Sequence, residues 1–166
     1  MQKGKPAKWS TVDKAIGKAL ASAKSVALIS NTVISPSLSS SIEALKSSTS
    51  ATFEHIQYDP ISYSAIRRAN ELNFGKSFIP TYNFSKAKTI VSFGADFLST
   101  WLMPTVFSCQ YGEKRNPDGK WMSKHFQFEA VMSVTGSNAD YRAMTKPSEE
   151  ESVLRYILAK LNNKSA

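Results

Sequence analysis

The sequence predicts an α/β fold: a three-layer, doubly wound and mainly parallel sheet in a single, Rossmann-like domain. The first observation is a short apolar, β-branched run over 89–93 that ends at Gly94-Ala95-Asp96. A run of this length between turn formers is typical of a strand buried on both faces. The second observation is the alternation of helix-like and strand-like segments, which favours parallel strands with helices on both faces.

The expected elements follow one another without long gaps. In chain order they are a helix from Ser10, a strand over 25–29, a helix from Pro36, a strand over 52–56, a helix over 62–72, one turn over 85–87, a strand over 89–93, a helix from Pro104, a strand over 124–130, a loop over 135–138, an extended piece over 140–144 and a helix from Lys146.

Local signals place the boundaries of the first half. Ser10-Thr11-Val12-Asp13 resembles a capping box, which predicts a helix start. The buried face of this helix is expected at Val12, Ile16, Leu20 and Ala23. Proline suits the first turn of a helix, so Pro36 predicts the second helix, and Gly75 predicts the end of the third.

The second half is read in the same way. Gly94 lets the chain turn sharply where the strand over 89–93 ends, and Asn116 to Gly119 is a strong turn signal. The segment over 124–130 alternates like a strand with one solvated face. Lys146-Pro147-Ser148-Glu149-Glu150 places proline and acids in the first turn of the last helix, where the dipole favours them.

Composition limits the function classes. The net charge is +8, but the basic residues are spread out, and no aromatic-interleaved basic motif occurs. A solvated basic surface is therefore favoured over a nucleic-acid footprint. The single cysteine, Cys109, excludes an intrachain disulfide and a Cys-based cluster or zinc site. We expect Cys109 to lie in the middle of a helix, with its thiol packed against neighbouring side chains. No apolar stretch is long enough to span a bilayer.

No catalytic or metal-binding constellation is visible. His55 and His125 are the only histidines, and each falls in an expected strand rather than in a metal-binding helical spacing. The glycine turn after 89–93 reads GAD and not GxGxxG, so a dinucleotide site is weakly supported. Asp96 and Asp140 are the carboxylates placed near strand ends, and a turn-forming role is favoured for both.

Two stretches nevertheless resemble a known family. TIVSFGADFLSTW (89–101) and MSVTGSNADYRAMTKPSEEESVL (132–154) together look like the molybdopterin oxidoreductase superfamily. The sequence of these stretches most resembles that of the large iron–sulfur subunit of alternative complex III, a quinol:cytochrome c oxidoreductase. The family's glycine turn, Thr-containing loop, Ala-Asp pair and proline-led helix correspond here to 94–96, 135–136, 139–140 and 146–147.

The resemblance also has departures. Family members that bind molybdopterin guanine dinucleotide typically carry an Asp-Pro-Arg turn after the later strand and Pro-Gly-Thr-Asp at the last helix. The corresponding stretches here read Glu129-Ala130-Val131-Met132 and Pro147-Ser148-Glu149-Glu150. Replacing Gly-Thr by Ser-Glu removes a close backbone approach and adds negative charge near a would-be phosphate. The resemblance thus implies a molybdopterin-type fold that has lost its cofactor.

The resemblance implies a place and partners for the chain. We expect a tail at 1–8, the molybdopterin-oxidoreductase-like domain at 9–162 and a polar tail at 163–166, as an excised part of a larger subunit. The expected role is structural, without activity or cofactor of its own, with iron–sulfur clusters elsewhere in the parent. The partners would be the rest of that subunit and other subunits of a periplasm-facing membrane complex in the cell envelope, without nucleic acid.

Two other functions stay open. A working cofactor-binding half of an oxidoreductase would need the candidate residues Asn31, Asp96, Thr135 and Lys146 to converge around a molybdopterin or nucleotide. These positions come from the ends of the expected strands and from the last helix, where ligands of doubly wound sheets sit. An independent basic binding module would instead show a salt-sensitive affinity for nucleic acid.

Overall fold

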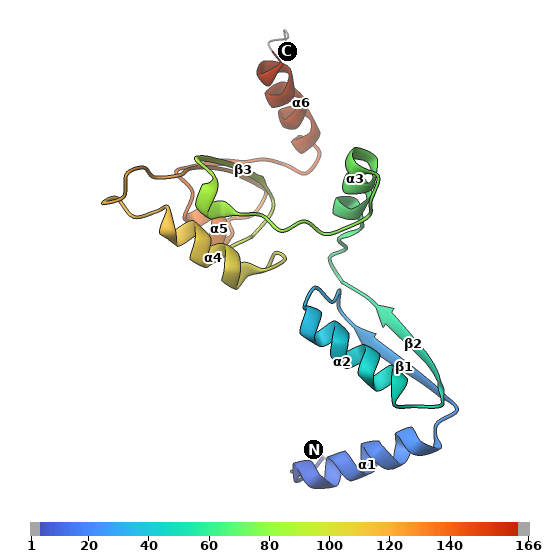
Figure 1. Ribbon diagram of the computed structural model, residues 1–166. Helices are drawn as coiled ribbons and strands as arrows, with labels where there is room; N and C mark the ends of the chain where they lie inside the picture. Colours follow the sequence, from blue (N-terminus) through green and yellow to red (C-terminus); the bar gives the residue numbers. More distant parts are fainter. Residues whose placement is uncertain (1–3, 163–166) are drawn as a thin grey trace. The chain divides into compact units, whose positions relative to one another are not determined.

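The computed structural model describes residues 4–162 and shows an α/β protein (Figure 1). The chain divides into two compact units, Met1–Ile79 and Pro80–Ala166, called here the N-terminal and the C-terminal unit. Every strand pair is parallel, which confirms the predicted class and the direction of the strands. The strands form one sheet of two strands and one of three. The polar tail expected at 163–166 lies outside the described residues.

The N-terminal unit is built on two strands. Its elements are α1 (Trp9–Ser22), β1 (Ser25–Ser30), α2 (Pro36–Ser47), β2 (Thr52–Gln57) and α3 (Ser64–Phe74). The strands β1 and β2 pair in register from Ser25↔Thr52 to Ser30↔Gln57. Helix α2 crosses from one strand to the next, as parallel pairing requires.

Helix ends in this unit follow the local signals in two of three cases. Ser35 Oγ accepts a hydrogen bond from the amide of Leu38, with Pro36 in the first turn of α2. Gly75 closes α3 in the left-handed region at φ 70°, where glycine carries no Cβ penalty. The capping box predicted at Ser10 is wrong, since α1 begins at Trp9 and Lys8 at the N-cap forms no side-chain cap.

The C-terminal unit carries the three-stranded sheet. Its elements are the 3₁₀ turn η1 (Phe84–Lys86), β3 (Thr89–Phe93), α4 (Pro104–Glu113), β4 (Lys124–Glu129), α5 (Val134–Ser137), β5 (Tyr141–Met144) and α6 (Glu150–Leu161). The sheet order is β3-β4-β5. Two elements differ from the prediction. Most of the loop expected over 135–138 lies in the short helix α5, and the last helix begins at Glu150, four residues later than Lys146.

An aromatic core joins η1, β3 and α4. The buried members are Phe84, Ile90, Phe97, Phe107 and Tyr111. The Phe84 and Phe97 rings stack at 4.5 Å between centroids, and Phe107 meets Phe84 edge-on at 5.1 Å. These are the offset and T-shaped geometries that the ring quadrupoles favour. Ile90 joins the core from the buried face of β3, so the core lies on one face of the three-stranded sheet.

Burial differs from the sequence-based expectation at several positions. The strand over 89–93 was expected to be buried on both faces, but Val91 is 48% exposed, because only the face with Ile90 and Ser92 meets the aromatic core. In β1, exposed and half-buried positions alternate, and Ile29 is exposed. No residue of α1 is buried, so its apolar stripe covers no core. Apolar periodicity predicts which residues share a face, not whether another element covers it.

Within residues 4–162, no helix combines the length and the apolar character that crossing a bilayer requires.

Candidate functional site

The carboxyl edge of the β3-β4-β5 sheet is the place where a doubly wound fold would hold a ligand. Strand β3 ends there at Phe93, and the φ of 60° at the following residue, Gly94, confirms the predicted glycine turn. The Gly94 amide donates to the carbonyl oxygen of Phe128 at 2.8 Å, which ties the turn to β4. The turn aims the following residues, Ala95 and Asp96, across the edge toward α5.

Asp96 and Thr135 form a clamp at this edge. Asp96 Oδ1 accepts hydrogen bonds from the Thr135 amide at 3.0 Å and from the Thr135 hydroxyl at 2.8 Å. The same hydroxyl oxygen accepts the amide of Leu98 at 2.9 Å, and Thr135 is fully buried. Two of the four candidate residues are therefore brought together, but they bind each other.

The other two candidates lie elsewhere. Lys146 is exposed, and its Nζ lies 3.5 Å from Glu149 Oε1, while its amide donates to Glu149 Oε2. Asn31 is an exposed residue of the N-terminal unit, immediately after β1. Lys146 is thus paired with an acid on its own segment rather than with the Asp96–Thr135 clamp.

A second acid, Glu129, ends β4 and is 3% exposed. Its carboxylate accepts hydrogen bonds from Arg142 Nε at 2.6 Å, from the Ser133 hydroxyl at 2.7 Å, from the Ser133 amide and from Gln127 Nε2. A Cβ added to Gly136 would lie 1.8 Å from Glu129 Oε1, so only glycine fits over this carboxylate. The site holds a buried charge with its lone pairs largely occupied.

Sequence reasoning missed that Glu129 continues a buried polar column along β4. The Tyr111 hydroxyl lies 3.2 Å from His125 Nδ1, and His125 Nε2 lies 3.2 Å from Gln127 Oε1. Gln127 then donates to Glu129. The alternation in Lys124–Glu129 places these three polar side chains on one face, as expected, but that face is the buried one. Polar residue types had suggested a solvated face.

Burial and neighbouring groups set the charges of the column. Burial lowers the pKa of His125, so the imidazole is uncharged at neutral pH. Burial would raise the pKa of Glu129, but hydrogen bonds from Arg142 and Ser133 outweigh it and hold that pKa below its usual value. The hydrogen bond from Arg115 lowers the pKa of Asp140 to about 2. The column therefore carries a neutral imidazole between two paired carboxylates.

Arg115 and Asp140 close the opposite end of the column. Arg115 Nη1 and Nη2 donate to the two Asp140 oxygens at 2.7 and 2.8 Å, a bidentate pair. Asp140 Oδ2 also accepts the amide of His125 at 2.7 Å. Asp140, expected to bond to nearby backbone, thus ties the segment after α4 to the start of β4.

The buried imidazole predicts an acid-sensitive C-terminal unit. Because the folded-state pKa of His125 lies below its unfolded value, the unfolded chain binds the proton first, and stability falls as the pH drops below about 6.5. One proton limits the slope to about 1.4 kcal/mol per pH unit. Urea midpoints between pH 7.5 and pH 5.5 should show this loss for the unchanged protein. The loss should persist in His55→Gln and disappear in His125→Gln.

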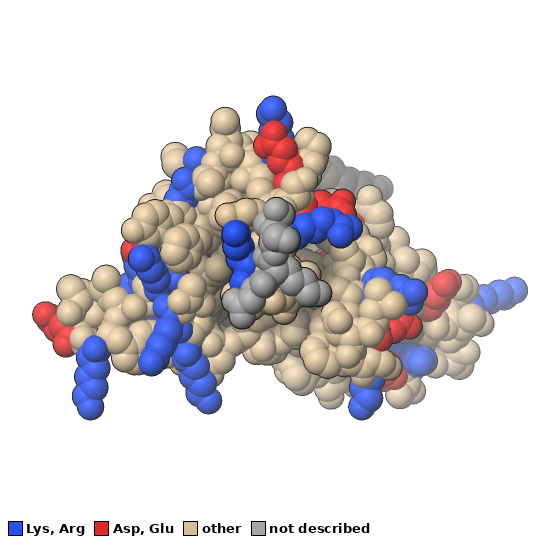
Figure 2. All heavy atoms as spheres, turned by 90° about the horizontal axis from the view of Figure 1, so that it is seen from above, with Lys and Arg blue, Asp and Glu red and all other residues tan. Residues whose placement is uncertain are grey.

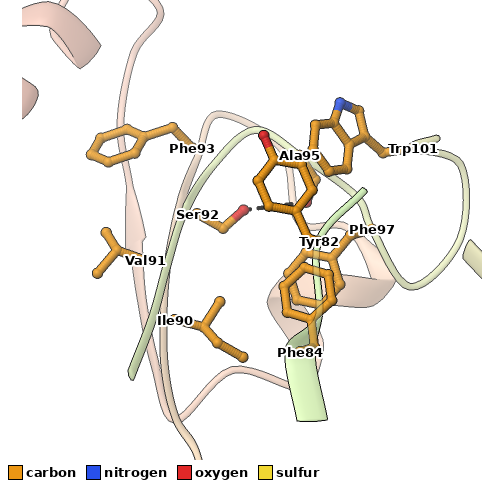
Figure 3. A pocket seen from close by; sticks show the side chains of 9 residues that line it. All are labelled: Tyr82, Phe84, Ile90, Val91, Ser92, Phe93, Ala95, Phe97 and Trp101. Atoms are coloured by element: carbon orange, nitrogen blue, oxygen red, sulfur yellow. Dashed lines mark hydrogen bonds between the residues drawn. The ribbon is translucent and has the colours of Figure 1, made fainter. Parts of the chain in front are cut away.

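An apolar pocket of about 190 Å³ lies beside β3 (Figure 3). Its lining residues are Tyr82, Phe84, Ile90, Val91, Ser92, Phe93, Ala95, Phe97 and Trp101. The rings of Tyr82 and Trp101 lie 5.5 Å apart between centroids in its lining, and the Ser92 hydroxyl already donates to the carbonyl of Ala95. The pocket can receive an apolar group but offers it few polar partners.

The remaining candidates carry no catalytic arrangement. Cys109 is exposed, which makes the predicted packed thiol wrong, because the face of α4 that it occupies does not meet the core. His55 is half-buried, with Nε2 2.8 Å from Ser30 Oγ. Within residues 4–162, no three His, Cys, Asp or Glu side chains are grouped so as to hold a metal ion.

Comparison of the chain with protein-family models and with curated proteins found no match.

Proposed function

We propose that this chain is a structural, cofactor-less domain of a molybdopterin-oxidoreductase-like iron–sulfur subunit, in a respiratory complex that oxidises quinols. The observation that carries the proposal is the state of the carboxyl edge of the β3-β4-β5 sheet. There, Asp96 is bound by Thr135, and Glu129 is bound by Ser133 and Arg142. Polar groups that would have to face a nucleotide are used to hold the edge together.

The charge at this edge supports the same proposal. Glu150 Oε1 lies 4.0 Å from the position that a Cβ on Gly94 would take. A phosphate approaching the glycine turn would therefore meet a carboxylate, at a distance where like charges repel strongly in a partly desolvated site. Glu150 belongs to the Pro-Ser-Glu-Glu stretch, where the sequence differs from the Pro-Gly-Thr-Asp motif of the cofactor-binding family members.

The outer face of the three-stranded sheet supports a role within a larger assembly. Parallel sheets normally have both faces covered. Here Val91 is 48% and Tyr141 is 55% exposed on the face that points away from the aromatic core. A domain packed against the rest of a parent subunit accounts for these exposed side chains. In Figure 2 basic side chains extend into solvent, several of them side by side, and acidic ones lie among them in places. Along the sequence the basic residues are spread out without a long basic block, which favours a protein partner over nucleic acid.

The direct test is a thermal-shift titration with guanosine and adenosine nucleotides and with molybdopterin guanine dinucleotide, at two salt concentrations. The proposal expects no shift with any of them. A ligand at a hundred times its dissociation constant would add about 2.7 kcal/mol, which is several degrees for units of this size. A salt-tolerant shift specific for guanine ligands would overturn the proposal. A shift with every polyanion that vanishes at high salt would identify a basic nucleic-acid-binding module instead.

One observation favours the second function, a working molybdopterin- or nucleotide-binding domain. The apolar pocket of about 190 Å³ adjoins the turn at Gly94, and the rings of Tyr82 and Trp101 could receive a planar base. Under this function, Trp101→Ala would abolish a guanine-dependent shift, whereas Trp121→Ala would leave it unchanged. The absence of any shift in the unchanged protein removes this alternative at once.

A further inference from the structure

A polar cleft of about 350 Å³ lies in the N-terminal unit, at the carboxyl ends of β1 and β2. Its lining residues are Thr32, Gln57, Asp59, Ser62, Tyr63, Ser64 and Arg67. Three segments contribute to it: the turn after β1, the turn after β2 and the first turns of α3. Its position is the one at which parallel α/β sheets hold ligands, and its size falls in the usual range for small-molecule sites.

The acidic wall of the cleft is held in place by the protein. The Thr32 amide donates to Asp59 Oδ1 at 2.9 Å, and the Thr32 hydroxyl donates to Asp59 Oδ2. The hydrogen bond from the Thr32 hydroxyl has the larger effect and the one from the Thr32 amide the next, and both keep the pKa of Asp59 below its usual value. Asp59 is therefore a carboxylate at neutral pH. Each oxygen accepts one of these bonds and retains a further lone pair for a hydroxyl donor.

The basic wall is supplied by Arg67. The positive charge of Arg67 also lowers the pKa of Asp59, and the residue is half-buried. Among residues 4–162 its side chain takes part in no hydrogen bond or ion pair. Its neighbour Arg68 instead bonds Glu71 at 2.7 Å. A guanidinium that lines a cleft with five donors and no protein acceptor is suited to a phosphate.

We propose that this cleft binds a small phosphate ester that carries a vicinal diol, such as a ribose phosphate. Asp59 follows β2 by two residues, where the acid of a dinucleotide fold accepts ribose hydroxyls, and Arg67 takes the phosphate. The turn after β1 reads Ser30-Asn31-Thr32 and lacks the glycines that admit a pyrophosphate. The ligand is therefore a monophosphate and not a dinucleotide.

The two charges make the specificity of the cleft. A free phosphate would bind Arg67 but be repelled by the Asp59 carboxylate. A free sugar would form hydrogen bonds with Asp59 alone. A ligand with both groups satisfies both walls at once, so its affinity should exceed that of either part. The proposal concerns residues of the N-terminal unit only, and it stands or falls independently of the cofactor-less edge described for the other unit.

The test is a titration of the ¹⁵N-labelled full chain with ribose 5-phosphate, ribose and inorganic phosphate, followed by amide chemical shifts. Ribose 5-phosphate should bind in the millimolar range, on the order of 1 mM, and shift the amides of Thr32, Asp59 and Arg67. Ribose and phosphate should each bind at least about tenfold more weakly, since each lacks one charge-assisted contact. Shifts confined to 80–162, or phosphate binding as tightly as the ester, would overturn the proposal.

Variants separate the cleft from general surface charge. Arg67→Gln and Asp59→Asn should each weaken ribose 5-phosphate binding by at least about tenfold. Arg68→Gln, one residue along α3 and exposed, should leave the affinity unchanged. An equal loss in Arg68→Gln would show a diffuse basic surface and refute the site. If Asp59→Asn disturbs the fold, as its amide spectrum would reveal, Arg67→Gln alone decides the outcome, because the Arg67 side chain forms no hydrogen bond or ion pair within the described residues.

Discussion

Glu129→Ala is expected to destabilise the C-terminal unit by about 3–5 kcal/mol, because it removes a buried acceptor and leaves its donors unpaired. Arg142 would keep its charge with no partner, and the Ser133 hydroxyl and Gln127 amide would lose theirs. A loss of this size is a large part of the total stability of a small domain. Urea unfolding followed by tryptophan fluorescence measures it, since Trp101 and Trp121 both lie in this unit.

Two controls make the Glu129 result specific. Glu113→Ala removes an exposed acid at the end of α4 and should change stability by less than about 0.5 kcal/mol. Adding Arg142→Met to Glu129→Ala should recover part of the loss, because the unpaired charge goes with it. A Glu129→Ala protein within about 1 kcal/mol of the unchanged one would mean that solvent reaches this carboxylate, contrary to its 3% exposure.

Phe107→Ala is expected to cost about 3–5 kcal/mol, since the ring is fully buried and its removal leaves a cavity in the aromatic core. The ring contacts Phe84 edge-on and lies within 6.3 Å of Tyr82 and 6.1 Å of Trp101, measured between centroids. Trp101 should therefore become more solvated, and its emission should shift to longer wavelength even before unfolding.

The matched control for Phe107 is the preceding residue. Val106→Ala changes a side chain that is 44% exposed on the same helix, and its effect should stay below about 1 kcal/mol. Similar losses for the two variants would contradict a stabilising role of the buried Phe107 ring, because alanine is the better helix former at both positions and helix propensity cannot account for a loss.

Local chemistry explains which elements could be predicted from the sequence. Pro36 begins α2, Gly75 ends α3 and Gly94 turns the chain after β3, all as expected. In each case the backbone preference of one residue decides the outcome, so no knowledge of distant residues is needed. The capping box at Ser10 failed because a side-chain cap forms only if the backbone of that residue stays outside the helix.

The candidate site was predictable only in part. Asp96 was selected at the end of a strand and Thr135 in the loop expected over 135–138, and the two meet across 39 positions of the chain. His125, Gln127 and Glu129 were not predicted to form a buried set, because a strand with a buried polar face and a strand with a solvated polar face have the same alternating pattern. No local pattern marks this set, because the close approach of Gly136 to the Glu129 carboxylate is visible only in the tertiary structure.

Local patterns were enough to predict the α/β class, the alternation of helices and strands and the parallel direction of the strands, because periodicity and turn residues act within a few positions of the chain. Burial could not be predicted in this way: Val91 and Cys109 are exposed, the polar face of β4 is buried, and Asp59 and Arg67 line the same cleft. These outcomes depend on which surfaces meet, and contacts between residues distant in the chain are not written in any local pattern.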